Sequence, residues 1–231
     1  MPTDETELAD DALTPGARTT LRRKRERGAY DRGLINAVLD EALVAHVGFV
    51  ADHGPVVLPM TYVRIGDDLY LHGAAGNDML RHLTGGAGVC VTVTLLDGLV
   101  LARSAFHHSM NYRCVVLFGR PERVTDLDEM QRASAGLVDH IAPGRSADAR
   151  RPTPAELRAT VMIRLPIDEG SAKVRTGGPI DDGEDLDLDV WAGEIPVRLV
   201  ADAPITDRAG ARAVPVPAYV AERLNPGPSG R

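Results

Sequence analysis

The chain has 231 residues, of which 44% are hydrophobic, and it carries a formal net charge of −7. This length and composition fit one domain with extensions and a substantial core. The acidic balance argues against a nucleic-acid-binding protein, which usually presents a basic face. The sequence contains no run of about 18 apolar residues, so we expect no membrane span.

The two ends of the chain differ in character from its middle. Residues 1–27 are polar, charged and without periodicity, which predicts a disordered N-terminal arm whose basic run at 22–25 is solvated. Residues 225–231 are expected to fray. The N-terminus also lacks the apolar core of a signal peptide. We therefore expect one domain over residues 28–224, in a cytoplasmic protein.

The first half of that domain begins with a helix and continues as strands. A helix is expected over residues 31–42, because Leu34, Ile35, Val38 and Leu39 share one face and Asp31 can cap the start. The expected elements that follow are strands at 43–50 and, within 56–74, two strands joined at Gly66, then a helix at 76–86 that ends at a glycine pair, and a strand at 89–96.

The second half alternates short strands and helices. Asp97-Gly98 is a typical turn signal and predicts a hairpin. The expected elements that follow are strands at 99–103, 112–119 and 120–126, an amphipathic helix at 126–141, a short helix at 154–160, a strand at 161–168, a loop at 177–189 and a last structured piece at 190–200. Short strands with turn signals favour an antiparallel barrel, so the fold class is mainly β with peripheral helices.

The cysteines and the adjacent histidines are the first candidates for chemistry. Cys90 and Cys114 lie in apolar runs, and we interpret both as reduced, buried thiols. Neighbours on a strand point to opposite faces, so His107 and His108 are poorly placed to bind one metal ion, and we expect no metal site. Two readings stay open: one surface and one packed histidine, or one histidine that faces a ligand.

A second candidate lies where a strand meets a helix. His72 precedes the small-residue stretch 73–76 and the helix after it. Small residues let a ligand approach the backbone, and a helix N-terminus favours anions, so phosphate is the natural ligand. The alternative is an ordinary turn. Ser104 and Ser109 lack the GxSxG context of a hydrolase nucleophile.

Three segments together resemble one known family. They are VVLPMTYVRIGDDLYLHGAAGNDMLRHL, VCVTVTLLDGLVLARSAFHHSMNYRCVVLFG, and VMIRLPIDEGSAKVR with VWAG. They are similar to the flavin-binding split-barrel proteins related to pyridoxamine 5′-phosphate oxidase, and more closely to nitroimidazole-reductase-like members. The resemblance implies a six-stranded antiparallel split β-barrel and a homodimer with FMN in two clefts at the interface.

The resemblance also implies roles for individual residues. His72 would lie at the reactive face of the flavin, as the catalytic group. The cofactor-binding residues would be Leu58, Pro59, Met60, Thr61, His72, Gly73, Ala74, Asn77, Arg81, Ser104, His108, Arg113, Cys114 and Trp191. Asn77-Asp78 departs from the family, which usually places a cation there to hold the phosphate, so a deazaflavin or haem remains an alternative cofactor.

The implied function is an FMN-dependent oxidoreductase that passes electrons from NAD(P)H to a small acceptor. Two other functions stay open. One is a non-catalytic flavin-binding or flavin-storage protein. The other is a dimeric ligand-binding protein that has lost the flavin. Neither nucleic acid nor a membrane is expected as a partner.

Overall fold

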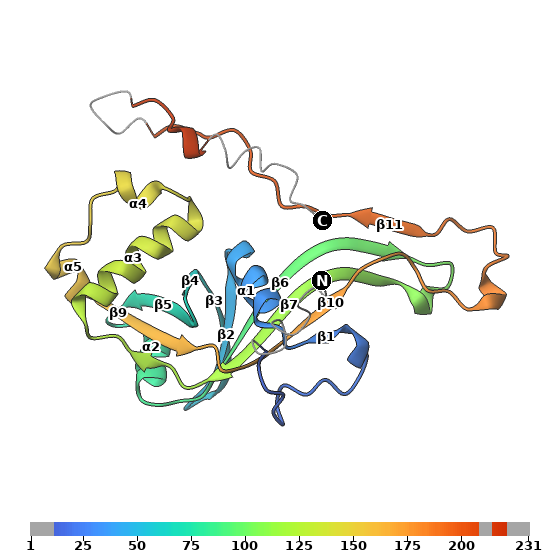
Figure 1. The fold of residues 1–231 in the computed structure, drawn as a ribbon, viewed down its shortest axis with the longest axis horizontal. Coiled ribbons are helices and arrows are strands. Elements are labelled where there is room, and N and C mark those ends of the chain that lie inside the picture. The colour runs from blue at the N-terminus through green and yellow to red at the C-terminus, as the bar shows by residue number, and fades with distance from the viewer. Residues whose placement is uncertain (1–11, 208–213, 221–231) are drawn as a thin grey trace, which may run out of the picture.

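The computed structural model describes residues 12–207 and 214–220, which form two antiparallel sheets with helices at the periphery (Figure 1). The strands are β1 (Gly28–Ala29), β2 (Ala45–Ala51), β3 (Gly54–Met60), β4 (Tyr62–Ile65), β5 (Asp68–Ala74), β6 (Val89–Leu101), β7 (Ser109–Gly119), β8 (Glu122–Arg123), β9 (Thr160–Pro166), β10 (Glu169–Arg175) and β11 (Gly193–Pro196). The helices are α1 (Arg32–Glu41), α2 (Asp78–Thr84), α3 (Leu127–Ile141), α4 (Arg145–Asp148) and α5 (Pro154–Arg158), with short 3-10 turns η1 (Arg25–Arg27), η2 (Ala105–His107) and η3 (Gly183–Asp185).

The larger sheet is built around two long strands. Its order is β1-β10-β7-β6-β2-β3, and β11 adds to β6 at the end that β2 does not reach. β6 and β7, of 13 and 11 residues, form a ribbon that extends well beyond the rest of the domain (Figure 1). The smaller sheet has the order β4-β5-β9-β8.

The main core lies between the two sheets. Alternate side chains of β2, β6 and β7 face it, among them Val47, Val91 and Leu117, and they meet α1, α2 and the inner face of the smaller sheet. A second cluster lies on the outer face of the smaller sheet, under α3 and α5. Each sheet therefore presents one face to the main core.

The predicted fold class is confirmed, and so are most of its elements. The helix expected over 31–42 is α1, and the Asp31 carboxylate accepts a hydrogen bond from the Leu34 backbone N–H at 2.6 Å. The hairpin at Gly66 joins β4 to β5, with a positive φ of 62° that glycine tolerates. No helix in the described part of the chain is long and apolar enough to cross a bilayer.

The turn predicted at Asp97-Gly98 is wrong. β6 continues through this dipeptide, and the register with β7 shifts between Leu96 and Gly98. The reason is a close approach of backbones: Gly98 pairs with Pro196 of β11, and a Cβ at Gly98 would lie 3.3 Å from the Ile195 carbonyl oxygen. Glycine in a strand therefore marks a bulge here, not a reversal of the chain.

Part of the predicted disordered arm packs against the domain. Leu13 and Thr19 are buried, and Arg18 forms an ion pair with Glu169 at the start of β10. Leu13 packs in the main core, and this burial of apolar surface holds the segment against the domain. The polar sequence around Leu13 gave no sign of this contact. Residues 1–11 and the predicted tail 225–231 lie outside the described residues.

We expect Gly98→Val to destabilise the protein, because the added side chain must displace either Glu194 or the β11 backbone. Overpacking of this kind costs about 1–3 kcal/mol, measured as the free energy of unfolding in urea. The control is Gly178→Ala, since nothing lies within 4 Å of a Cβ at Gly178. Equal stability of the two variants would contradict the close approach of β11.

Candidate functional site

A groove of about 780 Å³ opens between the β2–β3 hairpin and the start of α2. From the hairpin it is lined by Phe49, Ala51, Asp52, His53, Val56 and Leu58. From α2 and the residue before it, it is lined by Asn77, Asp78, Met79, Arg81 and His82. One wall is thus largely apolar, and the opposite end carries amide and charged groups.

The sequence explains why α2 begins at the groove. Asn77 caps the helix, with its Oδ1 accepting a hydrogen bond from the Leu80 N–H at 3.3 Å. Gly73 lets the helix pack closely on β5, because a Cβ there would lie 2.9 Å from Leu80 Cδ1. Gly73 is therefore required by helix packing, whatever ligand it also admits, whereas a Cβ at Gly76 would meet nothing within 4 Å.

The charges at the polar end of the groove are already paired. Asp78 and Arg81 form an ion pair one turn apart on α2, and both side chains are exposed. The His82 ring lies across the groove, with its Nδ1 2.8 Å from the Asp78 carbonyl oxygen and its Nε2 3.8 Å from Asp52. The groove therefore lacks the concentrated positive charge that a tightly held phosphate prefers.

Residues 58–61, at the end of β3 and in the link to β4, lie in different environments. Leu58 lines the groove. Met60 is half-buried against the main core, whereas Pro59 and Thr61 are exposed. Pro59 pairs with His46, and successive side chains of β3 alternate, so Pro59 faces the outer side of the sheet.

His72 does not line the groove. It pairs with Met162, a member of the second cluster, so its ring lies on the face of β5 that α3 and α5 cover. Burial lowers the pKa of the imidazole, and its Nδ1 is buried without a hydrogen-bond partner. Gly73, the next residue, faces the α2 side instead, while Ala74 at the end of β5 is exposed.

Ser104, His108 and Trp191 lie at the far end of the β6–β7 ribbon. Phe49 of the groove pairs with Val89 at the start of β6, and Ser104 follows its end. Thirteen residues of extended strand span about 40 Å. A single chain therefore cannot bring these residues and the groove to one small ligand.

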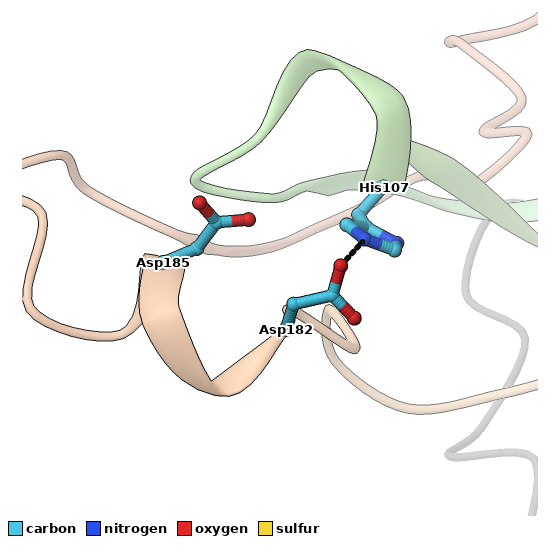
Figure 2. A group of neighbouring side chains, drawn as sticks. All are labelled: His107, Asp182 and Asp185. Atoms are coloured by element: carbon cyan, nitrogen blue, oxygen red, sulfur yellow. Dashed lines mark hydrogen bonds and ion pairs between the residues drawn. The ribbon is translucent and has the colours of Figure 1, made fainter.

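The two adjacent histidines at this end have different partners. The His107 Nε2 lies 3.1 Å from an Asp182 carboxylate oxygen, whereas the His108 Nδ1 lies 3.0 Å from the Ser104 carbonyl oxygen. His107, Asp182 and Asp185 offer three donor atoms within 4.8 Å of one another. Figure 2 shows the three side chains as neighbours. This group could coordinate a cation, but the hydrogen bond between His107 and Asp182 explains its geometry equally well.

Arg113 and Cys114 are also remote from the groove. Arg113 donates to Glu41 and to Asp97, and these hydrogen bonds raise the pKa of its guanidinium, so it is already committed within the fold. Cys114 is half-buried on the outer face of β7, and Cys90 is half-buried on β6. Burial raises the pKa of both thiols. Both cysteines are free, as predicted, but each is half-buried, whereas full burial was expected.

Sequence reasoning missed every residue on the hairpin side of the groove except Leu58. Phe49, Val56 and His53 have no motif around them. The turn at Gly54, whose φ is 121°, pairs β3 with β2, and the Phe49 ring lies 5.9 Å from the His82 ring of α2. The apolar run 43–50 followed by a glycine-containing break was the available signal. It predicted the strand, but not the surface that the strand faces.

We expect His72 to make the protein less stable as the pH falls below about 6.5, the ordinary histidine pKa. Its pKa is lowered in the folded state, so the unfolded chain takes up the proton first and stability declines with acidity. His72→Gln should therefore lose less thermal stability between pH 7.5 and pH 5. The control is His108→Gln at the exposed end of the ribbon, and an equal effect of both substitutions would contradict this account.

Comparison with known proteins assigns a family to this arrangement. The family model described as pyridoxamine 5′-phosphate oxidase matches residues 31–174, which includes both sheets except β1 and β11. None of the curated proteins matches the chain.

Solved structures resemble the chain over more of its length. The flavocytochrome Anf3 from Azotobacter vinelandii is 37% identical, with a TM-score of 0.85 over 91% of this chain and 98% of its own. The FAD and heme binding protein from Mycobacterium smegmatis is 38% identical, with a TM-score of 0.81 over 86% of this chain and 97% of its own. A 5-nitroimidazole antibiotic resistance protein from Bacteroides thetaiotaomicron shares the fold alone, at 24% identity and a TM-score of 0.53 over 64% of this chain and 86% of its own. The chain thus belongs to the flavin-binding family of pyridoxamine 5′-phosphate oxidase-like proteins.

Proposed function

We propose that this protein binds a flavin in the groove beside α2 and acts as a flavin-dependent oxidoreductase. The observation that carries the proposal is the groove itself, with an apolar wall at Phe49, Val56 and Leu58 and polar groups at its α2 end. A largely apolar cleft with a few orienting polar groups is the usual form of a cofactor site. A bound flavin supplies the electron-transfer chemistry, and the protein supplies binding, orientation and exclusion of water.

The lining residues suit different parts of such a ligand. Phe49 and Leu58 offer apolar surface to a flat ring and exclude water from it. The Asn77 Oδ1 is used as a helix cap, which leaves the amide Nδ2 as a donor toward the groove. Arg81 is the cation that faces the groove, with its charge shared by Asp78.

The flavin could be FMN or FAD, and the two kinds of evidence favour different forms. The resemblance of the sequence implies FMN. The two relatives at 37% and 38% identity include one described as an FAD and heme binding protein and one described as a flavocytochrome. The weak positive charge of the groove argues against strong dependence on a terminal phosphate. FAD is therefore the form that we favour.

Haem is a second candidate ligand, and it would accompany the flavin. The descriptions of the same two relatives favour it. His72 would be the residue to hold the haem iron, because burial lowers the pKa of its imidazole, which favours the neutral form, and its Nδ1 has no hydrogen-bond partner. Neutral imidazole is the form that coordinates haem iron.

The proposed reaction takes electrons from NAD(P)H and gives them to a small acceptor. Two alternatives differ from it in a measurable way. A storage protein would bind flavin without oxidising NAD(P)H. A ligand-binding protein that has lost the cofactor would bind neither flavin nor haem.

We further propose a homodimer in which each site takes residues from both chains. Ser104 and His108 lie about 40 Å along the ribbon from the groove of their own chain. If two chains pack with their β6–β7 ribbons antiparallel, the end of the ribbon of one chain lies at the groove of the other chain. The outer face of the β2–β3 hairpin suits such a contact, because Val50 and Val57 are 70% and 63% exposed. An obligate interface would bury more than roughly 2,000 Å².

The purified protein should carry its cofactors. We expect an absorption spectrum of oxidised flavin, and chromatography of the extracted cofactor should identify FAD. A Soret band that disappears in His72→Ala, with the flavin retained, would support the haem ligand. Apoprotein that takes up neither FMN nor FAD would refute the proposed function, and flavin without any NAD(P)H oxidation would leave the storage protein.

We expect Asp78→Asn to tighten flavin binding by a few-fold, or about 1 kcal/mol, because it frees Arg81 to face the cofactor phosphate. The measurement is a flavin titration of apoprotein, and the gain should shrink at high salt because exposed charges are screened. The control is Asp128→Asn, which removes another exposed first-turn carboxylate, from α3. Unchanged affinity in Asp78→Asn would place the phosphate elsewhere.

A further inference from the structure

One turn of the loop between β10 and β11 lies against the far end of the β6–β7 ribbon. The turn is η3 (Gly183–Asp185), which follows Asp182, and the ribbon end is η2 (Ala105–His107). Figure 2 shows the imidazole of His107 beside the two aspartates of this turn. One donor atom from each of the three side chains lies within 4.8 Å of the other two, so an imidazole nitrogen and two carboxylate oxygens share one small space.

The backbone of the turn holds the two carboxylates together. The Asp185 N–H donates to the Asp182 carbonyl oxygen at 3.0 Å, which closes a single 3-10 turn. Residues three apart are eclipsed in such a turn, so the two side chains leave it on the same side. Like charges placed this way repel each other. A cation between them would remove a repulsion that the fold imposes.

The negative charge of this loop is largely unbalanced within the described residues. Six of the nine residues 181–189 are acidic. Among residues 12–207 and 214–220, Asp181 pairs with an arginine and Asp182 with His107, while the carboxylate of Asp185 has neither a basic partner nor a hydrogen bond. The hydrogen bond between His107 and Asp182 therefore leaves the third member of the group uncompensated.

A separate clamp fixes the loop on the ribbon. The Asp181 carboxylate, whose side chain is 1% exposed, accepts hydrogen bonds from the Arg103 backbone N–H at 2.9 Å and from its guanidinium at 3.0 Å. This clamp sits next to Asp182 and uses none of the three donor atoms. The Phe106 ring also meets the His107 ring edge-on, with 5.2 Å between their centroids, and restricts its rotation. The donors are thus largely preorganised, which lowers the entropic cost of binding an ion.

We propose that His107, Asp182 and Asp185 bind a divalent transition-metal ion, with Zn²⁺ the best match. Imidazole combined with carboxylates suits such ions, whereas Ca²⁺ and Mg²⁺ prefer oxygen ligands alone. Three protein ligands are the number found in zinc sites that keep a position open for water. The ion would take the place of the proton between the His107 Nε2 and Asp182, so the hydrogen-bonded pair is the metal-free form of the same site.

This site is separate from the proposed flavin groove. The ribbon end lies about 40 Å along β6 from the groove, so either site can fail without the other. The two carboxylates follow residue 174, where the match to the family model ends. His108 takes no part in the group, and the opposed directions of the two adjacent histidines therefore do not prevent binding.

The first test is a zinc titration of the full-length protein, without an affinity tag and stripped of metal by a chelator. Calorimetry should show a saturable site that binds Zn²⁺ at least tenfold more tightly than Ca²⁺. Asp185→Asn should weaken zinc binding at least tenfold. The control Asp187→Asn, which removes the same charge from the same loop, should leave it within about twofold. Absence of saturable binding, or equal losses in the two variants, would overturn the site.

The second test locates the ion by NMR. Substoichiometric Mn²⁺ broadens the signals of nearby amides, and residues 105–108 and 182–185 should be broadened first. His107→Gln should abolish this selectivity, whereas the neighbouring substitution His108→Gln should preserve it. Broadening that begins instead at the groove beside α2, or a wild-type pattern that survives in His107→Gln, would overturn the proposal.

Discussion

The antiparallel ribbon of β6 and β7 is the constraint on which the rest of the structure depends. Its register is continuous from Val89 to Val100, except for the shift beside Gly98. β2 pairs with one end of β6 and β11 with the other. The groove is therefore fixed at one end of the ribbon, and the residues around Ser104 at the other. Any site that uses both ends must be assembled from two chains.

Charge pairing is the second feature that shapes the site. The cations that the sequence offers for a phosphate are already engaged: Arg113 with Glu41 and Asp97, and Arg81 with Asp78. In the proposed flavin site, affinity would then come chiefly from apolar contact with the hairpin wall.

The sequence predicted elements well where local signals decide them. Asp31 predicted the start of α1, and the alternation in residues 43–50 predicted β2. Both signals are local, because capping and the side-chain period are properties of short segments. It failed where distant segments meet. Gly98 serves β11, almost a hundred residues away, and the face that His72 occupies depends on β9 and on helices far along the chain. The groove does bring together three of the predicted residues, Leu58, Asn77 and Arg81, whereas no sequence signal indicated that Phe49 and Val56 line it.

In the proposed homodimer, one cofactor site takes its groove from one chain and the end of the ribbon from the other. A crystal structure of the flavin-loaded protein tests it most directly. The account predicts a flavin in contact with Leu58 and Asn77 of one copy and with residues near Ser104 of the second. A flavin whose contacts all come from a single chain, or one bound away from the groove, would contradict the account.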